Sequence, residues 1–197
     1  MAVADMIITP CKIFYSVPGT SAPADTVAAG GAWPTGWTAL GYTSVPLSVE
    51  IKREAAEADI QESLTPIQRG FKKESLIIET TLAEFTGSQL ALALSGTMSQ
   101  TPAGAGQPAK DELLFGDVTS VTERQWGFEG AYVSAAGNTH PIRFYIWKGV
   151  AESGCKLEFG KSDPSGTPLR ITANPDLSKA AGQRLSKIVK ITAPATS

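Results

Sequence analysis

The sequence predicts a mainly β fold with one short helix. Apolar and polar residues alternate over 47–52 and again over 75–82, and a period of two marks strands whose two faces meet different surroundings. The 197 residues also include 19 Gly and 13 Pro but only 18% charged side chains, which is typical of short strands joined by many turns. A chain of this length forms one well-packed domain, so residues 1–197 are expected to be a single unit.

The expected strands are bounded by Gly- and Pro-rich segments, and their order follows the chain. They cover residues 6–17, 45–53, 56–64, 74–82, 112–119, 124–134, 141–149, 155–160 and 168–174, with a last strand inside the C-terminal segment 182–197. Two long connections stand out, an N-terminal loop over 18–34 and an inter-strand loop over 63–74 that contains Pro66 and Gly70. Loops of this length are usually functional.

A single helix is expected over residues 82–95. After Thr81 the alternation stops, and an Ala- and Leu-rich run begins in which Leu82, Phe85 and Leu90 are spaced as in a short amphipathic helix. A second low-complexity loop follows over 99–106. The chain therefore combines many strands with one helical element.

Charge and hydropathy exclude several classes of protein. Seventeen basic against 19 acidic residues give a net charge of −2, whereas a protein that grips nucleic acid through its phosphates carries a Lys/Arg stripe. No apolar run reaches the roughly 18 residues of a membrane span, and the N-terminus lacks a secretory leader, so we expect a cytoplasmic protein without membrane contact. Cys11 and Cys155 are then expected to be buried free thiols.

The sequence offers no arrangement of catalytic or metal-binding residues. His140 is the only histidine and lies at an expected strand entrance, and no serine sits in a nucleophile elbow. One histidine and two separated cysteines do not supply the soft ligands of a zinc site. We therefore expect neither an enzyme nor a cofactor, and a structural or solvent-facing role for His140.

An aromatic row marks the expected strand over 124–134. Trp126, Phe128 and Tyr132 share one face, and aromatics in such a row normally pack into a core. A stacking platform for sugars or bases has the same pattern, so this second interpretation stays open at the level of sequence.

The stretch from Gly36 to Gly96 resembles the major tail tube proteins of long-tailed bacteriophages. The resemblance lies in the sequences and order of three segments, "WTALGYTS" from Trp37, "EADIQESLTPIQR" from Glu57 and "TTLAEFTGSQLALALSG" from Thr80. It covers about a third of the chain strongly and most of the remainder loosely.

This resemblance implies a β-sandwich with a flanking helix, whose inner strands join those of neighbouring copies in a barrel. Six subunits would form a ring, and stacked rings would make a hollow tube that conducts double-stranded DNA into the host cell. The implied partners are other copies of the chain and the tape-measure, tail terminator and distal tail proteins. The location is the virion tail, assembled in the host cytoplasm.

Two sets of residues become candidates within such a tube. Glu57, Asp59 and Gln61 alternate with apolar neighbours, and with Glu50 they are expected to line a lumen in which carboxylates let DNA slide. A solvated sheet face gives the same pattern. Arg69, Lys72 and Lys73 lie in the expected loop over 63–74, which in this family reaches toward the next ring, although a solvated loop tip is the common alternative. The segments 18–34 and 182–197 are further candidates for ring stacking.

Three other functions remain open from sequence. The inner tube of a contractile tail or a secretion system shares the architecture. A carbohydrate-binding β-sandwich would use the aromatic row, or Trp33 and Trp37, as its platform. A hydrolase would require an essential His140.

Overall fold

A computed structural model of the chain describes residues 11–58, 68–84, 86–117, 121–134, 137–152 and 166–193, and these contain ten strands and one helix. The strands are β1 (Lys12–Ser16), β2 (Thr38–Tyr42), β3 (Ser48–Ala58), β4 (Gln68–Leu82), β5 (Thr97–Thr101), β6 (Lys110–Leu114), β7 (Arg124–Val133), β8 (Thr139–Ala151), β9 (Thr167–Asn174) and β10 (Ser186–Lys190). The helix α1 covers Gly87–Ala93. The predicted mainly β fold with one helix is confirmed.

Eight of the strands form one antiparallel sheet in the order β2-β1-β7-β8-β9-β4-β3, with β10 paired to β8. An isolated bridge between Thr43 and Leu82 joins the β2 end of this path to β4. Two backbone hydrogen bonds of 2.8 Å support it, from Ser44 N to the Thr81 carbonyl and from Ala83 N to the Tyr42 carbonyl. Six strands thereby curl around a common core, as sheet twist allows, and β3 lies outside this closure.

The core is filled from the alternating inner faces of these strands. Trp126 is fully buried, and its indole N–H donates to the Gly149 carbonyl at 3.0 Å, so the ring brings no unpaired polar group into the core. On β4, the predicted inner face is confirmed, because Leu76, Ile78 and Leu82 are buried. The other large core side chains are Ile13, Phe128, Ile146, Leu169 and Ile171.

The helix is shorter than the predicted 82–95. The buried Leu82 ends β4, because the strand alternation continues to that residue, and the helix begins only after Thr86. Thr86 and Gln89 form a capping box in which each side chain accepts from the other residue's backbone N–H at 3.3 Å. The Gln89 amide also donates to the Leu40 carbonyl at 2.6 Å, which fixes the helix against the barrel.

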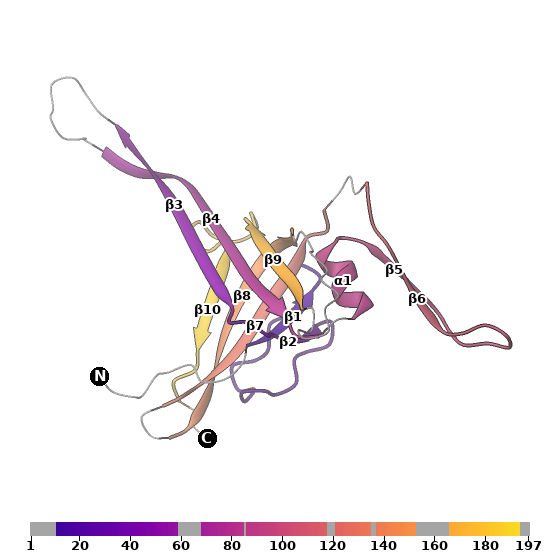
Figure 1. The fold of residues 1–197 in the computed structure, drawn as a ribbon. Helices are drawn as coiled ribbons and strands as arrows, with labels where there is room; N and C mark the ends of the chain where they lie inside the picture. Colours follow the sequence, from indigo (N-terminus) through magenta and orange to yellow (C-terminus); the bar gives the residue numbers. More distant parts are fainter. Residues whose placement is uncertain are drawn as a thin grey trace.

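Two hairpins project from the barrel in different directions (Figure 1). The longer one, β3–β4, corrects the prediction of two strands over 45–53 and 56–64 with a loop over 63–74. Residues 48–58 form one strand, and residues 68–74 belong to β4. The shorter hairpin, β5–β6, is also a correction, because residues 97–101 form a strand that pairs with β6, although a loop was expected from residue 99.

The remaining predicted elements are partly confirmed. The β9 and β10 strands lie where strands were expected in 168–174 and 182–197. The first strand is confirmed over Lys12–Ser16, whereas the expected strand over 155–160 lies outside the described residues. No helix among the described ranges is long and apolar enough to cross a membrane.

Candidate assembly surfaces

The outer edge of β3 is the longest open edge among the described strands. The strand has 11 residues, ends the path of the sheet and pairs only with β4 among the described strands. Val49 and Ile51 lie on one face of this strand and are 44% and 54% exposed. A long edge with exposed β-branched residues presents unpaired N–H and C=O groups, and proteins usually protect such an edge or use it for pairing.

The opposite face of the same hairpin is polar. Lys52 contacts Glu50 at 3.0 Å, and Arg170 of β9 lies 3.6 Å from Glu79. Across the described parts of the hairpin, 48–58 and 68–82, five basic residues balance five acidic ones. The described part of the hairpin is therefore neutral overall.

Two of the four predicted lumen residues belong to β3. Glu50 lies on the polar face and pairs with Lys52. Position 57 belongs to the same strand. Asp59 and Gln61 lie outside the described residues. The lumen-lining role of these four residues stays a prediction.

The predicted basic loop is largely strand. Lys73 has Glu54 as its partner across the ladder, and position 69 is opposite position 57. The register shifts after Glu54, so that Lys72 is the extra residue of a β-bulge. Bulges bend a strand and increase its twist, so this one re-aims the outer part of the hairpin.

The N-terminal loop over 18–34 is fastened to the barrel by a buried ion pair. Glu129 and Arg143 face each other in register on β7 and β8, and their side chains are 3% and 0% exposed. The Arg143 guanidinium donates from Nε to Glu129 Oε2 at 2.7 Å, and from its other nitrogens to the carbonyls of Ala24 and Val27 at 3.2 and 2.6 Å. Glu129 Oε1 accepts from Gly30 N at 2.8 Å. Both charges are thus hydrogen-bonded to the loop.

Aromatic packing completes this attachment. Trp33 stacks on Phe14 with ring centroids 4.0 Å apart and meets Trp37 edge-on at 4.8 Å. The loop approaches Gly127 so closely that a Cβ there would lie 2.4 Å from the Trp33 ring. Burial beside this loop raises the pKa of Tyr145 to about 12, although the charge of Arg143 opposes the shift. In the structure the loop covers its own barrel, whereas the sequence suggested a free contact arm.

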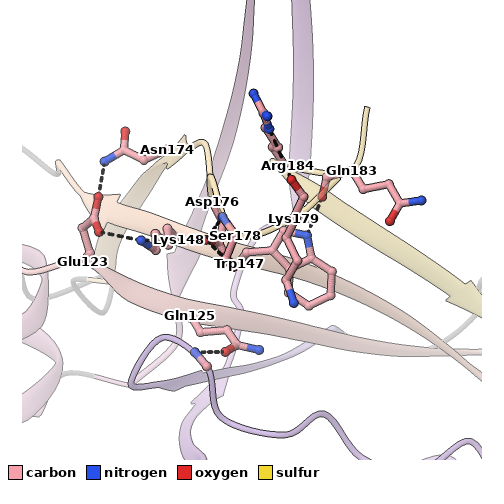
Figure 2. Close-up of polar contacts among 11 residues, drawn as sticks. Glu123, Gln125, Trp147, Lys148, Asn174, Asp176, Ser178, Lys179, Gln183 and Arg184 are labelled. Carbon is pink, nitrogen blue, oxygen red and sulfur yellow. Dashed lines mark hydrogen bonds and ion pairs between the residues drawn. The ribbon is translucent and has the colours of Figure 1, made fainter. Parts of the chain in front are cut away.

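A polar network orders the connection between β9 and β10 (Figure 2). Lys148 Nζ lies 3.9 Å from both Glu123 and Asp176. Asp176 accepts from the Ser178 backbone N–H at 3.1 Å and from its hydroxyl at 2.8 Å. These hydrogen bonds, the side-chain one first, lower the pKa of the Asp176 carboxyl, with a smaller contribution from the charge of Lys148. The turn is therefore fixed by its own side chains.

The aromatic row belongs to the core, as the sequence predicted. Trp126, Phe128 and Tyr132 are all at least 97% buried, so they offer no platform to a sugar. Trp33 and Trp37 pack on each other and on Phe14. The glycan-binding alternative therefore has no exposed aromatic row to use.

The described residues contain little that resembles a reaction site. His140 is buried beside the Tyr132 ring, with centroids 5.7 Å apart. Within the described ranges, no three His, Cys, Asp or Glu side chains come together where they could hold a metal ion. Cys11 is a free thiol whose pKa burial raises to about 11, which keeps it protonated near neutral pH. Cys155 lies outside the described residues.

These features define a β protein with a packed core, projecting hairpins and open strand edges. Residues 4–193 match the family model described as "Phage tail tube protein". This match covers nearly the whole chain, so the chain belongs to the phage tail tube protein family, and its role is that of a structural component of a virion tail. The predicted family is confirmed.

Two further comparisons add no functional detail. No curated protein sequence matches the chain. Among solved structures, the chain is similar to one titled "Crystal structure of Hcp protein", with 10% sequence identity, coverage of 83% of this chain and 87% of that one, and a TM-score of 0.30. A similarity at this level does not bear on function.

Proposed function

We propose that six copies of this chain form a ring, and that the rings stack into the hollow tail tube of a long-tailed bacteriophage, through which double-stranded DNA passes into the host cell. Family membership supports the tail tube role. The main structural support for ring formation is the open edge of β3, a strand on which Val49 and Ile51 are exposed. The tube would end on tail terminator and distal tail proteins and enclose a tape-measure protein, and it would assemble in the host cytoplasm.

Pairing of the β3 edge with a strand edge of the next copy would satisfy its backbone groups. Main-chain hydrogen bonds give such added strands their affinity, and alternate side chains give them specificity. Closing the ring in this way would leave no open edge at β3, as in other barrels. A barrel of roughly 24 strands, four from each copy, is wider than a porin of 16–18 strands, which already leaves an open channel.

The polar face of the β3–β4 hairpin is suited to a lumen that DNA passes without sticking. Fixed and unpaired Lys or Arg side chains would bind phosphates with release of counterions. On this face Lys52 is paired with Glu50, and the hairpin carries equal numbers of acidic and basic residues. Pairing of this kind would leave few free cations to bind phosphates, and the lumen-lining role of Glu50, Glu57, Asp59 and Gln61 is part of this proposal.

A single substitution on the β3 edge tests the ring. Ile51→Lys places a charge where the next copy would pack, whereas Val17→Lys makes the same kind of change at an exposed apolar residue away from this edge. Negative-stain electron microscopy and sedimentation of the concentrated proteins measure assembly. We expect rings or tubes from the wild type and from Val17→Lys, and dispersed folded subunits from Ile51→Lys.

Two results would count against the proposal. If the wild-type protein stays monomeric at high concentration, even when seeded with preformed tail tips, the proposed ring would be refuted. Tubes from Ile51→Lys as abundant as those from the wild type would show that the β3 edge is not an interface.

A further inference from the structure

Two described segments carry unbalanced charge, and their signs are opposite. Residues 97–117, which contain the β5–β6 hairpin, include three acidic residues and one basic residue, a net charge of −2. Residues 175–193, which contain β10 and the turn before it, include four basic residues and one acidic residue, a net charge of +3. The larger β3–β4 hairpin is neutral over its described residues. The charge of the projecting parts is thus concentrated in two places.

The acidic segment is a hairpin with little support from its own subunit. Its two strands pair with each other and contact α1, and they form a separate two-stranded sheet. An isolated two-stranded hairpin is at best marginally stable in water. Leu114 and Phe115 at the end of β6 are 67% and 68% exposed, which leaves an apolar patch next to the acidic residues Asp111 and Glu112. A hairpin of this kind gains stability when a partner covers it.

The basic segment is rigid and also presents an apolar side chain. Trp147 donates from its indole N–H to the Gln183 carbonyl at 2.8 Å, and the Lys179 ammonium lies 4.7 Å from the same ring (Figure 2). With the Asp176 turn, these contacts fix the approach to β10. On β10 itself, Ile188 and Lys187 are exposed, and the strand pairs only with β8 among the described strands. An ordered site binds a partner with less entropic cost.

The two segments lie on opposite sides of the barrel. In Figure 1 the β5–β6 hairpin extends to the right of the body, and β10 lies along its left side. A subunit with complementary surfaces on opposite sides forms head-to-tail contacts, which close into a ring when the rotation between copies allows it.

We propose that the acidic β5–β6 hairpin of one copy docks on the basic β10 segment of the next copy around the ring. The two strand edges would lie side by side, so that Leu114 and Glu112 extend the face of β10 that carries Ile188 and Asp111 extends the face that carries Lys187. This proposal rests on the ring proposed above and adds a second interface to it, separate from the β3 edge. Opposite charges at such a contact select the correct partner and speed association.

Charge reversal followed by mixing tests the contact. The acid-side variant is Asp111→Lys with Glu112→Lys, and the base-side variant is Arg184→Glu with Lys187→Glu. Each variant alone sets like charges against each other, so we expect its assembled fraction to fall about tenfold or more. In a one-to-one mixture, the basic hairpin of the acid-side variant can bind the acidic β10 segment of the base-side variant. The unchanged acidic hairpin of the base-side variant can bind the unchanged basic β10 segment of the acid-side variant. The mixture is therefore expected to assemble as alternating copies, which an even-numbered ring permits.

Lys110→Glu is the control, because it makes the same hairpin more acidic, whereas the acid-side variant makes it more basic; it also frees the Glu112 carboxylate, which Lys110 contacts at 2.8 Å in the wild type. It is expected to assemble at least as well as the wild type. Sedimentation velocity and negative-stain microscopy measure assembly, and circular dichroism checks that every variant is folded.

The outcomes separate this contact from the ring itself. Suppose that the wild type forms rings. If each variant also assembles alone, or if their mixture stays dispersed, the contact between these two segments is refuted but ring formation is not. If the wild type forms no ring, the proposed function and this contact fall together.

Discussion

Glu129 and Arg143 form an ion pair beneath the N-terminal loop, with 2.7 Å between Oε2 and Nε and almost no exposure of either side chain. Both side chains also form hydrogen bonds with the backbone of the loop: Arg143 with the carbonyls of Ala24 and Val27, and Glu129 with the N–H of Gly30. Burying two charges is costly unless they are paired and fully hydrogen-bonded, and this pair meets both conditions. The pair therefore determines where the loop lies on the barrel.

Breaking the pair is expected to destabilise the protein strongly. Arg143→Met leaves the Glu129 carboxylate buried without its partner, which typically costs about 3–5 kcal/mol of the free energy of unfolding. Urea unfolding measures this free energy. A second substitution, Glu129→Gln in the Arg143→Met background, is expected to recover part of the loss because it removes the unpaired charge.

The exposed pair of Arg53 and Glu74, 2.8 Å apart, is the reference for this measurement. Arg53→Met is expected to change the free energy of unfolding by no more than about 1 kcal/mol, because water screens exposed pairs. Equal costs for Arg53→Met and Arg143→Met would contradict the role assigned to the buried pair.

Gly127→Ala is expected to loosen the N-terminal loop. The added Cβ would meet the Trp33 ring at 2.4 Å, so the ring must move away and its stack on Phe14 must change. Overpacking of this kind usually costs about 1–3 kcal/mol. Near-UV circular dichroism and urea unfolding report the change. Gly104→Ala, at a glycine with no neighbouring atom within 4 Å, is expected to leave both unaltered, and equal effects of the two substitutions would refute the close contact.

The helix cap gives a smaller and local prediction. Thr86→Ala removes the side-chain oxygen that accepts from Gln89 N, and loss of such a cap costs about 1 kcal/mol. Thermal and urea unfolding measure the loss. Ser88→Ala keeps the cap acceptor and is expected to cost less than half as much; a ranking in the reverse order would contradict the capping geometry.

The raised pKa of Cys11 predicts that the free energy of unfolding depends on pH in the alkaline range. Its pKa is raised to about 11 in the folded protein from an ordinary value of 9.0, because burial disfavours the thiolate. The folded state therefore holds this proton more tightly than the unfolded state. The stability that this group contributes is complete below pH 9 and is lost as the pH rises through 11.

Thiol labelling measures this shift directly, since the thiolate is the reactive form. In a Cys155→Ser background, the labelling rate of native protein is expected to rise up to about pH 11, and that of urea-unfolded protein to level off near 9. A native rate that levels off at the same pH as the unfolded one would show that Cys11 is not shielded.

The sequence predicted the parts of the fold in which one face of a strand is buried. On β4, residues 76, 78, 80 and 82 are buried, as the alternation indicates, because the core imposes a period of two on that stretch. The pattern fails over 53–58, where the described side chains of β3 are exposed on both faces. Nothing there requires alternation, so a continuous strand was interpreted as two.

The attachment of the N-terminal loop also escaped prediction. Glu129 and Arg143 are 14 residues apart, and only the pairing of β7 with β8 brings them opposite each other. A charged residue within the apolar middle of each strand is a signal, but a single sequence does not specify the strand register that pairs the two charges. The two projecting surfaces likewise depend on the directions of hairpins, which local pattern does not encode.

The 15 residues of β4 belong to two parts of the molecule at once, and this has a mechanical consequence. Its first part pairs only with β3 in the projecting hairpin, whereas residues 77–82 are held in the barrel by β9. A pull on the hairpin is carried along the covalent backbone of β4 and loads its hydrogen bonds with β9 in shear, all of them together. In the proposed tube, tension between neighbouring copies would thereby be shared by the whole β4–β9 ladder, and many hydrogen bonds in parallel would resist bending.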